Sequence, residues 1–117
     1  MRWFERYLTP PRTAEVGAAR IVAALPLYGY RWRKTAETEV VSFEDARRLT
    51  TMTNTVLSRD LGSSMLHASS PEGWEIWISD RVLVERLVRD ARRLGVTTFA
   101  LWRLGLEDPD VWEMIGR

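Results

Sequence analysis

The sequence predicts an α/β fold organised around two parallel strands and the helix between them. Three stretches carry this prediction: an apolar run at 20–27, an amphipathic helical pattern at 81–94 and a second apolar run at 96–102. Apolar runs of this length, flanked by breakers, are typical of strands buried on both faces. With an insertion between them, these stretches outline a right-handed parallel crossover.

The composition is that of one ordinary globular domain. The chain has 117 residues, 45% of them apolar and 28% charged, with a net charge of +1. Its 17 basic residues, of which only Lys34 is a lysine, alternate with 16 acidic ones. This mixture is typical of a solvated surface, so we expect no nucleic-acid partner.

No motif for a cofactor or a metal is present. The chain lacks a glycine-rich phosphate loop, a zinc-protease motif and a nucleophile elbow. Cysteine is absent, and His67 is the single histidine, which excludes thiolate metal sites and sites built on two histidines. We expect neither a cofactor nor a metal.

The first residues, 1–8, are amphipathic and charged, without the apolar centre of a signal peptide. No window approaches the length of a membrane span, so we expect no membrane partner, and the compartment stays undetermined. Residues 2–8 have the spacing of one face of a short helix, which Pro10 and Pro11 end.

Residues 34–79 predict a small α+β insertion. In order, they suggest a polar loop at 33–38, a short strand at 39–41, a helix from its N-cap Ser42 to about Leu57, a turn at 58–64, a weak strand at 65–68, a turn at 69–73 and a strand at 74–79. In the last strand Trp74, Ile76 and Ile78 share one face, whereas Glu75 and Trp77 share the other.

The second half of the chain carries clear helix boundaries. Ser79 or Asp80 is placed to cap the helix at 81–94, and Gly95 stands where a glycine commonly ends a helix. Asp108 and Pro109 predict the start of a last short helix, with Asp108 as its N-cap.

Aromatic residues follow both predicted parallel strands. Tyr28, Tyr30 and Trp32 come just after the first strand, and Trp102 ends the second. Carboxyl ends of strands in α/β sheets form ligand sites, and aromatic rings can stack on the flat faces of sugars. We therefore expect these four residues to bind carbohydrate; the alternative is that the rings only cover the edge of a core.

The acidic residues do not form an evident catalytic pair, and no catalytic residue is predicted. Glycoside hydrolysis ordinarily needs two carboxylates held a fixed distance apart. Asp80 and Asp108 suit helix caps, Asp60 suits a turn, and Glu75 and His67 suit a solvated strand face and a structural role.

Four motifs occur in an order that resembles glycoside hydrolase family 18, the chitinase-like (β/α)8 barrels. They are LPLYGYRW at 25–32, VSFEDA at 41–46, GWEIWISD at 73–80 and LGVTTFALWRLGLEDPDVW at 94–112. The resemblance is to the C-terminal part of the barrel, and its nearest branch is the bacterial spore-germination or peptidoglycan-processing type. It covers about residues 3–115.

The resemblance implies that 20–27 and 96–102 correspond to the seventh and eighth strands of a TIM barrel, and 34–79 to the insertion that walls the cleft. It implies that Trp102 floors the subsite of the reacting sugar, and that Tyr28 and Tyr30 belong to the aromatic rim. Near the hairpin, where the family has aromatic residues, this chain has Met65, Leu66 and His67.

The acidic Asp-x-x-Asp-x-Asp-x-Glu motif of the family does not occur in these 117 residues. Its glutamate protonates the leaving oxygen while the N-acetyl group of the substrate attacks. A complete barrel needs roughly 250 residues. We expect a partial barrel, 1–117, that binds N-acetylglucosamine oligosaccharides (chitin or peptidoglycan) and does not cleave them alone. We expect it to be a fragment, a truncated gene product or a piece that pairs with a separate chain completing the barrel. The alternative is a non-catalytic carbohydrate-binding or scaffold module.

Overall fold

The computed structural model describes residues 15–115. Its elements, in chain order, are η1 (Ala18–Arg20), β1 (Val22–Pro26), β2 (Gly29–Arg33), β3 (Ala36–Val41), α3 (Phe43–Met52), β4 (Ser58–Arg59), β5 (Leu66–Ser69), β6 (Trp74–Ile78), α4 (Arg81–Arg93), β7 (Thr98–Trp102) and α5 (Val111–Ile115). The short helix expected at 2–8 lies outside the described residues.

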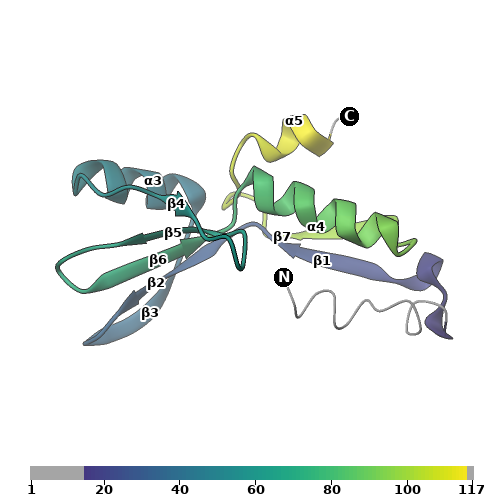
Figure 1. Ribbon diagram of the computed structural model, residues 1–117, viewed down its shortest axis with the longest axis horizontal. Coiled ribbons are helices and arrows are strands. Elements are labelled where there is room, and N and C mark those ends of the chain that lie inside the picture. The colour runs from purple at the N-terminus through teal and green to yellow at the C-terminus, as the bar shows by residue number, and fades with distance from the viewer. Residues whose placement is uncertain (1–14, 116–117) are drawn as a thin grey trace.

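The molecule consists of two units placed side by side (Figure 1). One is a parallel pair, β1 and β7, with α4 between them in the chain and packed beside β1. The other is an antiparallel sheet in the order β3-β2-β6-β5-β4, with α3 packed against β6. The predicted mixed α/β class and the pairing of two parallel strands are therefore confirmed, while residues 15–115 contain no closed barrel.

The two parallel strands are buried on one face only, which corrects the prediction of burial on both. Along β1, Ala23 and Leu25 are buried against α4, whereas Val22 is 56% exposed. Along β7, Phe99 and Leu101 pack on the same cluster, and the alternate residues are exposed. The cause is that, among the strands of residues 15–115, β1 and β7 pair only with each other, and that α4 covers one face.

The antiparallel sheet begins at Gly29, five residues before the insertion that was expected at 34–79. The additional residues form β2, a strand that the sequence did not predict. The polar stretch expected as a loop, 33–38, instead forms the turn and paired ends of a β2–β3 hairpin. Gly29 allows this pairing: a Cβ there would lie 2.1 Å from the carbonyl oxygen of Trp77 on β6. Only glycine lets the two backbones approach so closely.

Helices α3 and α4 begin as their capping residues predict. Ser42 Oγ accepts a hydrogen bond from the Asp45 amide, and an Asp80 carboxylate oxygen accepts one from the Leu83 amide. However, α3 ends at Met52 and not near Leu57, because Asn54 adopts a left-handed conformation (φ 52°). Gly95, at φ 85°, follows α4 as expected.

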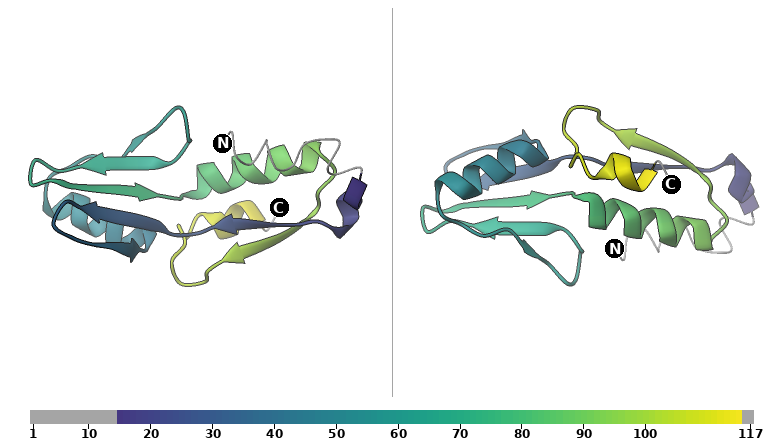
Figure 2. Two further views of the ribbon diagram at one scale, coloured as in Figure 1. Left: turned by 90° about the horizontal axis from the view of Figure 1, so that it is seen from below. Right: turned by 90° about the horizontal axis from the view of Figure 1, so that it is seen from above.

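The apolar face of the antiparallel sheet is covered by α3. Trp74, Ile76 and Ile78 are buried on the face that the sequence predicts, together with Ala46 of α3. Seen from below in Figure 2, the strands lie in front of α3. We call the opposite side of this sheet the open face, because none of the described helices packs on it.

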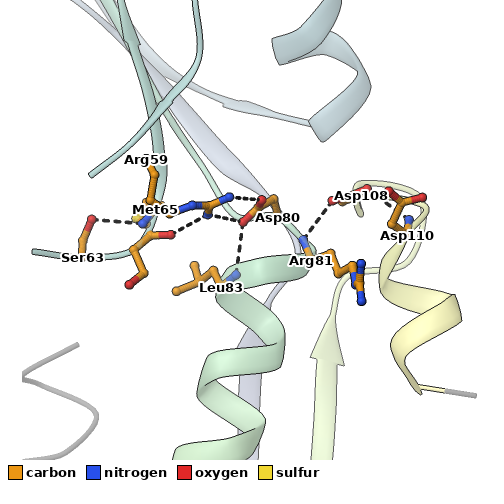
Figure 3. A network of polar contacts seen from close by, with 9 residues as sticks. Arg59, Ser63, Met65, Asp80, Arg81, Leu83, Asp108 and Asp110 are labelled. Carbon is orange, nitrogen blue, oxygen red and sulfur yellow. Dashed lines mark hydrogen bonds and ion pairs between the residues drawn. The ribbon is translucent and has the colours of Figure 1, made fainter. Parts of the chain in front are cut away.

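A polar network joins the two units where β6 leads into α4 (Figure 3). Arg59 of β4 donates to Asp80, and the Asp108 carboxylate accepts from the Arg81 amide (2.9 Å) and the Asp110 amide (3.1 Å). Asp108 thus holds the start of α4, whereas α5 begins only at Val111, later than its expected start at Pro109.

Candidate functional site

Tyr28, Tyr30 and Trp32 form a continuous series of rings. The centroids of Tyr28 and Tyr30 lie 5.5 Å apart with the ring planes at 88°, and those of Tyr30 and Trp32 lie 6.1 Å apart at 50°. Tyr30 is 37% exposed and Trp32 50% exposed. The structure therefore brings these three predicted residues together and leaves rings accessible.

The sequence predicts that all three rings follow the end of β1. Two of them, Tyr30 and Trp32, instead belong to β2 of the antiparallel sheet. Tyr30 and Trp32 alternate along β2 with Arg31 and Arg33, so they lie on the open face. The two arginines pair with Glu39 of β3, each at 2.6 Å, on the other face. The exposed rings consequently lie apart from these charges.

Trp102 lies at the carboxyl end of β7, as predicted, and is 65% exposed. It is the register partner of Pro26, and its carbonyl oxygen accepts a hydrogen bond of 2.7 Å from the Leu27 amide. The peptide bond between Trp102 and Arg103 is cis. Within residues 15–115, backbone bonds place Trp102 near the start of the ring series, but its indole contacts none of those rings.

His67, Glu75 and Trp77 form a second cluster on the open face. The imidazole of His67 lies 4.1 Å from the Trp77 ring at an interplanar angle of 35°, and its Nε2 lies 2.7 Å from Glu75 Oε1. The sequence predicts a structural role for His67 and a solvated strand face for Glu75. The alternation in β6 places Glu75 and Trp77 on one face, but it does not reveal that β5 sets His67 opposite Trp77 and within hydrogen-bond distance of Glu75.

The tyrosines supply polar groups beside the rings. The pKa of Tyr28 is raised above its ordinary value, chiefly by a side-chain hydrogen bond with Tyr30 and further by burial. The Tyr28 phenol therefore remains protonated at neutral pH, and phenol groups can donate or accept hydrogen bonds. A row of rings with phenol groups at one end suits a ligand with apolar faces and hydroxyl edges.

Acidic residues outside the ring series and the His67 cluster serve the fold. Asp80 and Asp108 accept from helix amides, and Asp60 accepts from the amide and hydroxyl of Ser63 at 2.8 and 2.7 Å. The pKa of Glu107 is lowered, first by a hydrogen bond with its own amide and also by one with the Trp112 indole. Because Asp60 bonds to Ser63 within its own turn, it is the turn residue that the sequence predicts.

The described part of the chain offers no group of three or more His, Asp or Glu side chains arranged to hold a metal ion. Among the helices between Glu15 and Ile115, none is long and apolar enough to cross a membrane.

Comparison with solved structures identifies the fold. The chain superposes on a chitinase from Chromobacterium violaceum with a TM-score of 0.75 at 21% identity, covering 90% of this chain and 34% of that one. It superposes on the spore cortex-lytic enzyme SleL from Bacillus cereus with a TM-score of 0.79 at 19% identity, covering 90% of this chain and 27% of that one. A class V chitinase from Pseudomonas fluorescens gives 0.77 at 19% identity, covering 97% and 37%.

No protein-family model and no curated protein sequence matches the chain. The chain spans 34% and 27% of the length of the first two similar structures, about a third and about a quarter. At these identities the likeness concerns the fold alone: the chain has the fold of one part of chitinase-type α/β structures.

Proposed function

We propose that this chain forms the sugar-stacking wall of a glycoside hydrolase family 18-type cleft. The parent activity is hydrolysis of β-1,4-linked N-acetylglucosamine polymers, chitin or peptidoglycan. In this proposal β1 and β7 correspond to the seventh and eighth barrel strands. Tyr28, Tyr30, Trp32 and Trp102 bind the saccharide.

The observation that carries the proposal is the exposure of Trp102 at the carboxyl end of β7, next to the start of the ring series. Ligand sites of parallel α/β folds lie at this end of the strands. The similar solved structures are chitinases and a spore cortex-lytic enzyme, and a variant of the class V chitinase from Nicotiana tobaccum was solved in complex with NAG4 (TM-score 0.70, 13% identity, covering 86% of this chain and 35% of that one).

We further propose that additional parallel strands, supplied by another chain or by another part of the same protein, cover the exposed face of β1 and β7. Parallel sheets are almost always buried on both faces. Val22 is 56% exposed here, and Ala24 and Ala100 on the same face are exposed as well. The catalytic acid would then come from this additional part, since the acidic motif is not among the 117 residues.

A non-catalytic carbohydrate-binding module is the second candidate, and the open face favours it. Tyr30 and Trp32 are presented by an antiparallel sheet that does not depend on a completed barrel. In this case binding resides in β2 and does not involve Trp102.

Titration of chitooligosaccharides against tryptophan fluorescence tests both candidates. Loss of binding in Trp102→Ala, with binding intact in the matched control Trp112→Ala, supports the cleft wall. Loss in Trp32→Ala alone supports the module. Absence of any binding to the parent chain rules out both.

A further inference from the structure

The backbone leaves Trp102 through a tight turn at residues 103–107, which we call the post-β7 turn. Trp102 is the last residue of β7, and its carbonyl oxygen accepts the 2.7 Å hydrogen bond from the Leu27 amide. Directly after it the chain reverses, and the Leu106 amide donates to the Arg103 carbonyl oxygen at 3.3 Å. The shape of this turn therefore sets the direction in which the chain leaves Trp102.

Hydrogen bonds, and not burial, hold the first part of the post-β7 turn. Leu104 is 69% exposed, so apolar packing contributes little there. Gly105 adopts a left-handed conformation (φ 95°) that glycine favours. Its amide donates to Glu107 Oε2 at 2.6 Å, which is the one partner of this amide in the described part of the chain. The Glu107 carboxylate thus closes the turn.

Both carboxylate oxygens of Glu107 accept hydrogen bonds. Oε1 accepts one of 3.1 Å from the indole Nε1 of Trp112, while Oε2 accepts from Gly105. The lowered pKa of Glu107 agrees with this arrangement. Its first cause is the hydrogen bond with its own amide, and the bonds with the Trp112 indole and the Gly105 amide add to it against the opposing effect of burial. The carboxylate is consequently ionised at neutral pH, the form that accepts on both oxygens.

The post-β7 turn also contacts the unit that carries the other rings. The Leu106 carbonyl oxygen accepts a hydrogen bond of 2.9 Å from the amide of Phe43, the first residue of α3. Helix α3 packs on β6, which pairs with the strand that presents Tyr30 and Trp32. The turn therefore connects Trp102 on the parallel pair to the antiparallel sheet, and its shape affects where Trp102 lies relative to those rings.

We propose that Glu107 is a positioning residue of the saccharide site, an inference that rests on the proposed function. By closing the post-β7 turn, its carboxylate holds Trp102 in the orientation that stacks on the sugar. Glu107 itself does not contact the saccharide. What it contributes is an acceptor at the place where the Gly105 amide needs one.

Calorimetric titration with the tetrasaccharide of N-acetylglucosamine tests this role. Glu107→Ala should weaken binding about tenfold, or about 1.4 kcal/mol, because the turn loses its hydrogen bond to a charged group. Glu107→Asp keeps the charge but shortens the side chain by one methylene, so it should weaken binding as well. Glu107→Gln keeps an oxygen that can accept from the Gly105 amide, and its affinity should stay within about twofold of the parent chain.

Two matched controls should bind as the parent chain does. Glu113→Ala removes the same charge from an exposed position on α5, whose side chain has no recorded hydrogen bond among residues 15–115. Trp112→Ala removes the bond at Oε1 of Glu107 but leaves the one to Gly105.

The indole N–H resonance of Trp102 in the saccharide-free chain separates positioning from a merely structural role. It should move in Glu107→Ala and Glu107→Asp and stay in place in Glu107→Gln, while urea unfolding midpoints change little. If circular dichroism shows that Glu107→Ala does not fold, Glu107→Asp decides.

Unchanged affinity in the folded alanine and aspartate variants would overturn the positioning role while the proposed function stands. An equal loss in Glu107→Gln, or weaker binding with an unmoved Trp102 signal, would overturn it too. If the parent chain does not bind the tetrasaccharide, or Trp102→Ala binds it as tightly as the parent, the proposed cleft wall fails and the role of Glu107 with it.

Discussion

The Arg59 guanidinium donates two hydrogen bonds, each 2.7 Å long, to the two carboxylate oxygens of Asp80. Asp80 is buried, and the same carboxylate accepts the Leu83 amide that begins α4. The pair raises the pKa of Arg59 above its ordinary value, chiefly through these hydrogen bonds. One carboxylate thus fixes the antiparallel sheet to the parallel unit (Figure 3).

Replacing Asp80 by alanine should destabilise the chain by about 3 kcal/mol, because the change removes a helix cap and leaves a partly buried arginine without its partner. Urea unfolding followed by circular dichroism measures this loss. The control, exposed Asp110→Ala, should change stability by less than about 0.5 kcal/mol. A loss below about 1 kcal/mol in Asp80→Ala would show that the helix cap contributes to stability but the pairing with Arg59 does not.

Gly29→Ala should be among the most damaging single substitutions, at about 3 kcal/mol or more. The new methyl group would meet the Trp77 carbonyl oxygen at 2.1 Å and the Ile78 Cα at 2.7 Å, both of them backbone atoms that cannot move aside cheaply. Gly62→Ala is the matched control, because its methyl group would lie 3.5 Å from an Asp60 carboxylate oxygen. Thermal unfolding of both variants checks the prediction, and equal stability would contradict it.

Ser63→Ala should raise the pKa of Asp60 toward its ordinary value. That pKa is lowered chiefly by the hydrogen bond from the Ser63 hydroxyl, with a smaller effect of the Ser63 amide. A carboxyl whose pKa is lowered on folding adds stability above its unfolded pKa and loses it as the pH falls through the folded pKa. The variant should therefore lose this contribution at a higher pH than the parent chain.

Carboxyl carbon shifts recorded by NMR during an acid titration measure the pKa of Asp60 directly. Ser70→Ala, in the turn between β5 and β6, is the control and should leave the titration of Asp60 as in the parent chain. An unchanged curve in Ser63→Ala would refute the assigned cause.

The purified chain should not release the chromophore from an N-acetylglucosaminide reporter. Substrate-assisted hydrolysis needs a carboxylic acid to protonate the leaving oxygen, and the acidic motif that supplies it does not occur in these residues. A chitinase assayed in parallel is the positive control. Turnover that survives rigorous purification and follows the chain through each column would contradict the proposal that this chain binds the saccharide while another part supplies the catalytic acid.

Much of the fold could be predicted from local patterns. The two-residue alternation in 74–78 identifies the buried face of β6, and the capping residues Ser42 and Asp80 identify the starts of α3 and α4. These signals are local because they depend on hydrogen bonds and side-chain directions within one element.

The strand β2 could not be predicted in the same way. Gly29 indicates a break when only its neighbours are considered, yet it allows close approach to β6, whose pairing residue lies far along the chain. The same distinction between local and long-range signals applies to the candidate site. Tyr28, Tyr30 and Trp32 are neighbours in sequence and were predicted together, whereas His67 joins the site only through the register of β5 and β6.

The indole N–H resonances of the isotope-labelled chain, recorded as the tetrasaccharide of N-acetylglucosamine is added, test the proposed sugar wall most directly. We expect the signals of Trp32 and Trp102 to shift with saturation. The signal of Trp74, buried against α3, and that of Trp112 on α5 should stay in place. Saturable shifts confined to Trp112, or no shift at any indole, would contradict the assignment of these strands as a saccharide-binding wall.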